Sequence, residues 1–269
     1  IMQIKTKAIV ISSLKYQEKS LIVKCFTQSD GLKSYFVQSA YSGKKSNQKI
    51  AYFQPLTILE IEANHKNKGT LEHFKEIKLA SAYQTINTNV FKSTIAIFLS
   101  EILYHSIKEE EKNENLFTFL EAALLCIDTH EETSNFHLIL LLEITKYLGF
   151  YPDISQIENT FFEMNEGIFS PLQGVNCLNT HETLLFKKLI NLKFDSNQKI
   201  FAGIERQIIL KILLDYYSIH LDGFKKPKSF PPPPPFFKKK KKPPPPPFFF
   251  FFFFLFFKIF FFFFFFFFF

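Results

Sequence analysis

The sequence predicts an α+β protein with two domains, a small β-barrel followed by an all-α domain. Two observations predict this fold class. Residues 1–80 contain five short runs rich in β-branched side chains, separated by turn residues. From Val90 onward the apolar residues instead recur with the helical period. We therefore expect a barrel domain at 1–80 and a helical domain at 81–229.

The five predicted strands of the first domain are short and closely spaced. They cover residues 5–14, 20–27, 32–39, 56–63 and 71–80. Ser29, Asp30 and Gly31 form a turn signal between the second and third strands, and polar loops follow at 41–49 and 64–69. Alternation is imperfect in 56–63, so both faces of that strand are expected to be partly covered. Five such strands in eighty residues predict a closed antiparallel barrel of the oligonucleotide-binding (OB) type.

The second domain contains four strong helical segments. We expect helices at 91–107 and 116–127, then one capped by Thr133 or Ser134, and a last one at 205–221. The third ends at Leu148, where Gly149 can form the C-terminal cap and Pro152 prevents continuation. It is apolar around most of its circumference, so it is expected at the centre of the domain. In the last helix a single apolar stripe is predicted, formed by Ile204, Ile208, Ile212 and Tyr216.

Charge is distributed unevenly between the two predicted domains. Residues 1–80 hold 13 lysines against 6 acidic residues, whereas residues 81–230 hold 13 basic and 19 acidic residues. The first domain is thus basic by 7 charges and the second acidic by 6. This asymmetry suggests that the barrel meets an anion.

Lysines and aromatic residues alternate along the barrel, as single-strand binding requires for phosphate neutralisation and base stacking. The alternative is that the lysines are solvated and that most of the rings belong to the core. The loop lysines are the better candidates, because rigid scaffolds carry function on loops. The aromatic candidates are Tyr16, Tyr35, Phe36, Tyr41, Tyr52 and Phe53. The DNA-binding candidates are Lys44, Lys45 and Lys49, followed by Lys7, Lys15 and Lys33.

Both ends of the chain are unusual. Met2 is expected to be the true first residue, and residues 230–269 consist almost entirely of Pro, Lys and Phe blocks. Each of these residues can be encoded by a single repeated base, so we interpret this low-complexity tail as a sequencing or translation artefact. The alternative is a tail anchor, because Phe248 to Phe269 is long enough to span a bilayer.

Chemical motifs are missing from the remainder of the sequence. There is no dinucleotide or phosphate loop, no zinc-protease motif and no nucleophile elbow. Cys25, Cys126 and Cys177 are far apart, without a C-x-x-C pair, and no secretory signal opens the chain. We therefore expect a cytoplasmic, non-enzymatic protein with no metal, no cofactor and no membrane attachment.

Several segments resemble the bacterial RecO family of recombination mediators, in a version like that of Bacteroidetes. The first is T-K-A-I-V-I-S-S-L-K-Y-Q-E-K-S-L-I-V-K-C-F-T at 6–27, followed by G-L-K-S-Y-F-V at 31–37 and F-Q-P-L-T-I-L-E-I-E at 53–62. In the second domain they are L-G-F-Y-P-D at 148–153, F-S-P-L-Q-G at 169–174 and H-L-D-G-F-K-K-P-K-S at 220–229. The resemblance covers residues 2–229.

The resemblance implies an OB-type barrel and a helical domain that bind single- and double-stranded DNA and anneal strands. It also implies two partners: RecR, which cooperates in loading RecA, and the acidic C-terminal tail of single-strand-binding protein. Many RecO proteins carry four zinc-binding cysteines after the central helix, whereas this interval keeps only Cys177. We therefore expect no zinc, and apolar packing in its place by Ile154, Ile157, Phe161, Phe162, Ile168 and Phe169. An adaptor that binds proteins without touching DNA is the alternative function.

Overall fold

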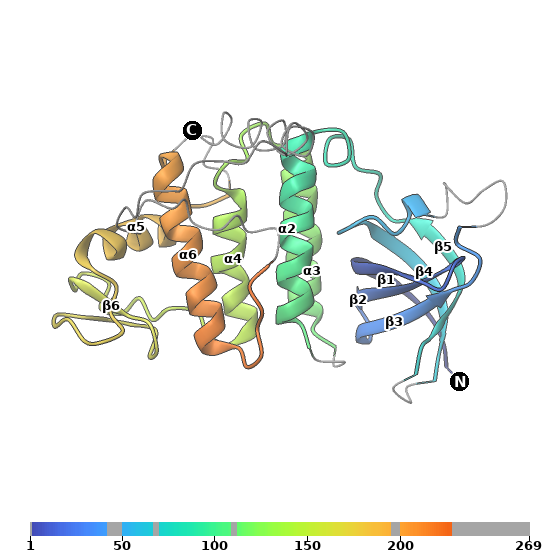
Figure 1. The fold of residues 1–269 in the computed structure, drawn as a ribbon, viewed down its shortest axis with the longest axis horizontal. Helices are drawn as coiled ribbons and strands as arrows, with labels where there is room; N and C mark the ends of the chain where they lie inside the picture. The colour runs from blue at the N-terminus through green and yellow to red at the C-terminus, as the bar shows by residue number, and fades with distance from the viewer. Residues whose placement is uncertain (1, 42–49, 67–69, 109–111, 195–199, 228–269) are drawn as a thin grey trace, which may run out of the picture.

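The computed structural model describes residues 2–41, 50–66, 70–108, 112–194 and 200–227 (Figure 1). The first domain is an antiparallel sheet in the order β3-β2-β1-β4-β5. Phe36 N donates to Glu72 O (2.9 Å) and Glu72 N donates to Ser34 O (2.8 Å), which joins β3 to the start of β5 and closes the barrel. The predicted fold class is confirmed. The strands are β1 (Met2–Tyr16), β2 (Ser20–Thr27), β3 (Gly31–Val37), β4 (Ile58–His65) and β5 (His73–Leu79).

The helical domain contains more elements than the sequence predicted. The described helices are α2 (Val90–Ser106), α3 (Glu114–Thr129), α4 (Phe136–Leu148), α5 (Thr180–Ile190) and α6 (Gly203–His220). A small hairpin of β6 (Phe161–Glu163) and β7 (Ile168–Ser170) precedes α5. The hairpin and α5 were not predicted, because three-residue strands and an eleven-residue helix give little periodicity. The capping box between Asn179 and Glu182 was the available signal for α5.

The central helix α4 starts later than predicted. Neither Thr133 nor Ser134 caps it: the helix begins at Phe136, after Asn135. Ser134 is instead engaged by the Glu132 carboxylate, which accepts a hydrogen bond from Ser134 N at 2.9 Å. Gly149, with φ 83°, forms the predicted left-handed C-terminal cap.

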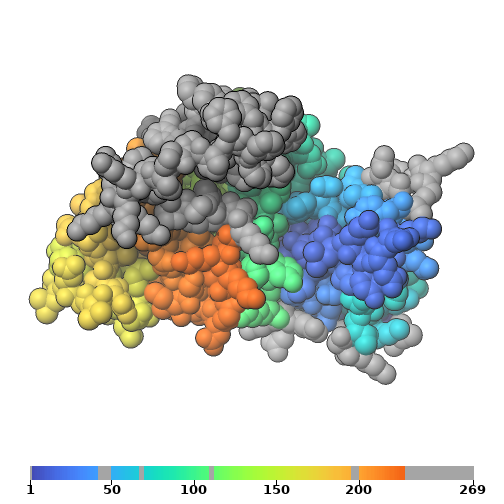
Figure 2. Space-filling view, in the orientation of Figure 1, coloured from blue at the N-terminus to red at the C-terminus, as the bar shows by residue number. Residues whose placement is uncertain are grey.

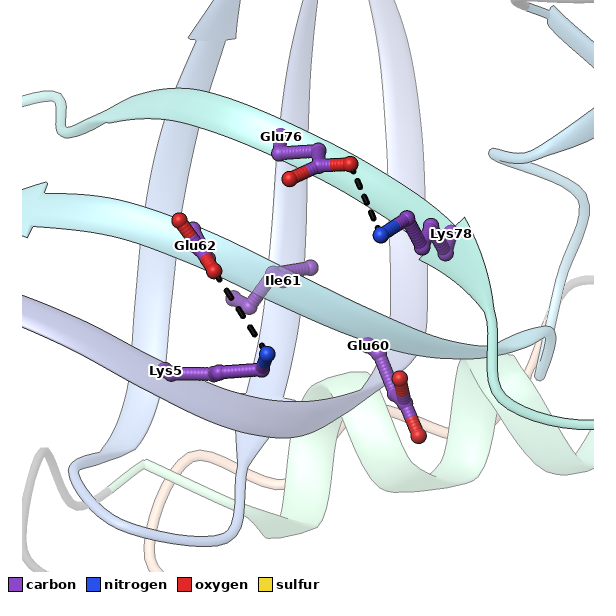
Figure 3. A pocket seen from close by; sticks show the side chains of 6 residues that line it. All are labelled: Lys5, Glu60, Ile61, Glu62, Glu76 and Lys78. Carbon is purple, nitrogen blue, oxygen red and sulfur yellow. Dashed lines mark ion pairs between the residues drawn. The ribbon is translucent and has the colours of Figure 1, made fainter.

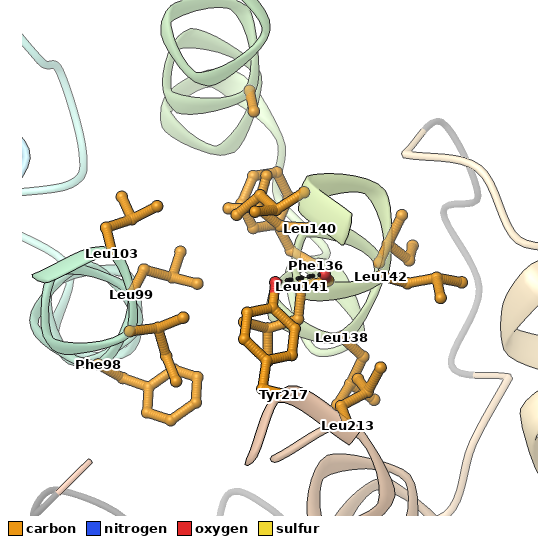
Figure 4. Packing of buried hydrophobic residues seen from close by; sticks show 14 of the residues in the cluster. Phe98, Leu99, Leu103, Phe136, Leu138, Leu140, Leu141, Leu142, Leu213 and Tyr217 are labelled. Carbon is orange, nitrogen blue, oxygen red and sulfur yellow. Dashed lines mark hydrogen bonds between the residues drawn. The ribbon is translucent and has the colours of Figure 1, made fainter. Parts of the chain in front are cut away.

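The packing around α4 confirms that this helix is the centre of the domain (Figure 4). Leu138 and Leu141 are fully buried, and Tyr217 of α6 donates its hydroxyl to Leu141 O at 2.7 Å. The predicted stripe on α6 is only partly correct. Ile212 and Tyr216 are buried, but Ile204 at the start of the helix is 55% exposed.

The buried apolar residues form two clusters, one inside the barrel and one that spans both domains. β1 contributes Ala8 and Val10 to the cluster inside the barrel. The alternating residues Ile9 and Ile11 face outward and join the core of the helical domain. Ile58 on β4 does the same, so both faces of β4 are partly covered, as its imperfect alternation predicted, although Glu60 on the outer face is exposed. In Figure 1, α2 and α3 lie between the barrel and the other helices, and α2 packs against β1.

A buried carboxylate ties the interdomain linker to α3. Asp128, 4% exposed, accepts hydrogen bonds from the backbone N–H groups of Gln84 and Thr85 (2.8 Å each) and Ile86 (2.9 Å). Burial alone would raise the pKa of this carboxyl, but these hydrogen bonds lower it on balance. The Lys92 ammonium donates to Asp128 O at 2.8 Å and to Thr85 Oγ1 at 2.7 Å.

Replacing Asp128 by Ala should strongly destabilise the protein. The substitution leaves buried linker N–H groups without acceptors, and each costs roughly 1–3 kcal/mol, so we expect a loss of about 3 kcal/mol in unfolding free energy. Urea denaturation measures this. Glu143→Ala, which removes only a surface pair with Lys146, is the control and should change stability by less than about 1 kcal/mol. Equal effects of the two substitutions would contradict the linker's role.

A second buried polar group, His137 on α4, makes stability depend on pH. The residue is 7% exposed, its Nδ1 has no hydrogen-bond partner within the described part of the chain, and its ring meets Phe98 edge-on. Burial, aided by the nearby Arg206 charge, lowers the pKa of His137 from 6.5 to about 4. The unfolded chain therefore binds a proton as the pH falls below 6.5, while the folded chain does not until about pH 4.

Replacing His137 by Phe should flatten the acid limb of the stability profile. The parent protein is expected to lose about 3 kcal/mol from this residue as the pH falls from 6.5 to 4. His65, whose pKa burial also lowers, would retain its own contribution. Urea midpoints measured across this range test the difference in slope, with His181→Phe, a change at an exposed histidine, as control. Parallel profiles for parent and His137→Phe would refute the assignment.

Candidate nucleic-acid interface

The outer face of β1, β4 and β5 carries a paired charge ladder. Lys5, Glu62 and Glu76 lie in one cross-strand row, and Lys7, Glu60 and Lys78 lie in the next. Lys5 Nζ lies 3.6 Å from Glu62 Oε1 and Lys78 Nζ lies 2.9 Å from Glu76 Oε1 across a shallow hollow (Figure 3). The three glutamates balance the three lysines of these rows, so this face offers a phosphate backbone no net positive charge.

Two barrel lysines are engaged by the helical domain. Lys7 Nζ lies 2.8 Å from Glu121 Oε1 of α3, and Lys24 Nζ lies 4.6 Å from the centre of the Tyr104 ring of α2. Part of the basic excess of the barrel is therefore neutralised inside the molecule. Lys7, one of the sequence candidates, is less available for a phosphate contact than an unpaired lysine, because its charge is already paired with Glu121.

Lys33 lies apart from the other candidates, at the end of the barrel that holds His65. It sits opposite Cys25 in the register of β2 and β3 and is half-buried. Burial lowers the pKa of His65. The negative charges of Asp30 and Glu72 counteract this shift, whereas the positive charge of Lys33 lowers the pKa further. His65 Nε2 also lies 2.8 Å from the Tyr35 hydroxyl, so this end of the barrel holds a buried polar network.

The remaining described candidate, Lys15, stands on the exposed end of β1. Its Nζ lies 5.4 Å from the centre of the Tyr41 ring. Tyr41 immediately precedes segment 42–49, which contains Lys44, Lys45 and Lys49 and lies outside the described residues. Lys19, in the hairpin between β1 and β2, is exposed, and Lys19 O accepts a hydrogen bond from Tyr41 N at 3.2 Å.

The six aromatic candidates divide between core and surface. Tyr35 and Phe53 are buried inside the barrel, where both stack on Phe74, with centroid distances of 4.1 and 5.9 Å. Tyr52 is half-buried and packs against the same cluster. The core interpretation is therefore correct for these three. Tyr16, Phe36 and Tyr41 instead lie at the outside of the barrel.

Two of the outer rings form a row with a histidine that the sequence did not point to. Tyr16 and Phe36 meet edge-on with centroids 6.0 Å apart, and Phe36 meets His73 edge-on at the same distance. We call Tyr16, Phe36 and His73 the aromatic row. His73 was missed because only closure of the barrel brings the start of β5 beside β3, and no local sequence signal reports that contact.

The lobe between α4 and α5 is held by aromatic packing. Phe162 is fully buried, with its ring centre 4.9 Å from that of Phe169 and 4.8 Å from that of Phe186. Ile154 and Ile168, expected in this packing, are 48% and 43% exposed and lie outside it. Cys177 Sγ accepts a hydrogen bond from Gly174 N at 3.1 Å. Over the described ranges, no three His, Cys, Asp or Glu side chains converge as a metal site would require.

The lobe should fold without zinc. Because aromatic packing already holds β6 and β7 together, we expect elemental analysis of the purified protein to find far less than one zinc per chain. Thermal unfolding should also be insensitive to a strong chelator. One zinc per chain, with destabilisation on chelation, would contradict this expectation.

The architecture defines a class of protein: an OB-type barrel followed by, and sharing a core with, a helical domain. Residues 2–83 match the family model for the N-terminal part of recombination protein O, and residues 87–229 match the model for its C-terminal part. The chain belongs to the RecO family.

Curated relatives agree with this assignment. DNA repair protein RecO of Flavobacterium psychrophilum is 72% identical over 229 residues, covering 85% of this chain and 96% of the relative. The RecO protein of Flavobacterium johnsoniae is 70% identical over 228 residues, with the same coverage. That of Phocaeicola vulgatus is 34% identical over 231 residues, covering 84% and 95%. Family membership assigns this chain a role in DNA repair and recombination.

In the described part of the chain, no helix is both long and apolar enough for a membrane span.

Proposed function

We propose that this protein is a non-catalytic recombination mediator that binds single- and double-stranded DNA in the cytoplasm through its barrel. The observation that carries the proposal is that some barrel lysines are paired with other side chains while others lie at an exposed end of the barrel. Those on the charge ladder and at the domain interface are paired, whereas Lys15 and Lys19 occupy the exposed end that leads into segment 42–49. Lys44, Lys45 and Lys49 belong to that segment and are proposed to contact phosphates, with Lys15 and Lys33 in support.

Within the RecO family role in repair, we further propose strand annealing. Binding through phosphates leaves the bases available for pairing, so two strands held on basic surfaces can anneal without any chemical step. RecR and the acidic C-terminal tail of single-strand-binding protein are proposed as partners, with loading of RecA onto coated strands as the outcome. These proposals rest on family membership and the electrostatics of the barrel.

An adaptor that binds only proteins is the second candidate, because Leu14 on the same end of β1 is 59% exposed and could form part of a protein contact. A titration of labelled single-stranded DNA followed by fluorescence anisotropy separates the two functions. The adaptor gives no saturable DNA binding at low salt.

Replacing Lys44, Lys45 and Lys49 together by Ala should weaken DNA binding and flatten its salt dependence. Each phosphate contact contributes roughly 0.7 to the slope of log K against log salt on single strands, so the triple variant should lose about 2. The measurement is an anisotropy titration at several salt concentrations.

The matched control replaces Lys5, Lys24 and Lys78 by Ala. These lysines lie in the same domain and their replacement removes the same charge, but they contact Glu62, the Tyr104 ring and Glu76. Their loss should leave the slope nearly unchanged. If the control flattens the slope as much as the loop variant does, the binding is governed by net charge and the assigned site is wrong.

A further inference from the structure

We propose that the aromatic row of Tyr16, Phe36 and His73 is a stacking platform for the unpaired bases of single-stranded nucleic acid. The inference rests on the proposed function, because it names the part of the ligand that this face of the barrel receives. It concerns bases, whereas the lysines discussed above concern phosphates.

The row is built by the closure of the barrel rather than by one strand. Tyr16 ends β1, Phe36 lies near the end of β3 and His73 begins β5. The backbone hydrogen bonds from Phe36 N to Glu72 O and from Glu72 N to Ser34 O hold the second and third rings side by side. The three rings therefore have a fixed spacing, with consecutive centroids 6.0 Å apart, along a path that crosses the strands.

The rings of the row do not stack on one another in parallel. The rings meet at interplanar angles of 84° and 81°. In such an edge-on contact the edge of one ring touches at most one face of the other ring, whereas a parallel stack covers one face of each ring. Tyr16 is 44% exposed, His73 is exposed and Phe36 is half-buried. By contrast, Tyr35 and Phe53 use their faces on Phe74 inside the barrel.

The charges around the row favour a polyanion. Lys15 and Lys19 flank Tyr16 in sequence and are exposed, and Lys75 follows His73 by two residues. Glu18, at the tip of the same hairpin, is the acidic residue nearest to Tyr16 in sequence. The glutamates of the charge ladder lie further along β4 and β5, in the rows formed with Lys5 and Lys7. Glu72, which precedes His73, is buried, and its carboxylate accepts hydrogen bonds from Lys66 N. The exposed charges nearest to the row in sequence are therefore mostly basic.

The chemistry of stacking fits an annealing protein. A ring that stacks on a base occupies the face of that base and leaves its pairing edge open, and stacking accepts all four bases. In a duplex the base faces are already covered by neighbouring base pairs, so the platform should discriminate in favour of single strands. The lysines alone would not make this distinction, since both forms carry phosphates.

The test uses the absence of tryptophan from the chain. Tyr16→Trp places a single indole in the row, and its emission reports stacking by quenching. We expect an oligodeoxythymidine of about 16 nucleotides to quench the emission in a saturable titration, at the concentrations where anisotropy shows binding. An abasic oligonucleotide of the same length carries the same phosphates and should bind without this quenching.

The control variant is Leu172→Trp, which places the indole on the lobe of the helical domain at a residue that is 77% exposed. Its emission should not respond to either oligonucleotide. If the abasic strand quenches the Tyr16→Trp emission as strongly as oligodeoxythymidine does, or if both bind without quenching it, the stacking platform is refuted while DNA binding stands. If anisotropy shows no binding of either strand to the parent protein, the proposed function itself fails.

A second variant separates stacking from charge. Phe36→Leu keeps an apolar side chain and every lysine, so it should weaken binding to oligodeoxythymidine about ten-fold, the order expected for one lost stack. Its salt slope and its affinity for duplex DNA should match those of the parent. Equal losses on single strands and duplex would instead mean that the row supports the fold or docks a protein, and would overturn the proposal.

Discussion

The packing of the barrel's outer face on α2 is the constraint on which the rest of the structure depends. A small barrel needs only its interior to be apolar, yet β1 and β4 are apolar on both faces where the helices cover them. Ile9 and Ile58 face away from the barrel interior and are fully buried. Burial of such side chains stabilises by about 2 kcal/mol each, so the helices are part of what makes this barrel stable. Asp128 then fixes the linker between them with three backbone hydrogen bonds.

This covering leaves only part of the barrel surface for ligands. One region is occupied by helices and a second by the paired charges of the ladder, as Figure 3 shows. The region that remains includes the hairpin after β1, the end of β3 and the start of β5. The charge and aromatic character of this region differ from those of the ladder. In the space-filling view the barrel, in blue, lies at one end of the molecule beside the helices in green (Figure 2).

The sequence predicted the strands, the four longer helices and the apolar centre at α4, because each of these has a local signature. Periodicity identifies an element, and Gly149 identifies its end. The parts that could not be predicted depend on contacts between residues distant in sequence. His73 joins Phe36 only through barrel closure, and Lys7 is paired by Glu121, which is 114 residues away. Ile204 has the spacing of a core residue, but it sits in the first turn of α6, where it stays 55% exposed among the described residues.

The charge asymmetry between the domains has two separable consequences. Part of the positive charge of the barrel is used in contacts within the molecule, those of Lys7 with Glu121 and of Lys24 with the Tyr104 ring. Partly exposed pairs of this kind contribute roughly 0–1 kcal/mol each and weaken with salt, whereas the shared apolar core does not depend on salt in this way. The two domains should therefore stay docked at salt concentrations that release a polyanion. A steep loss of DNA affinity with salt would then report the contacts between lysines and phosphates, and not a loosening of the barrel from its helices.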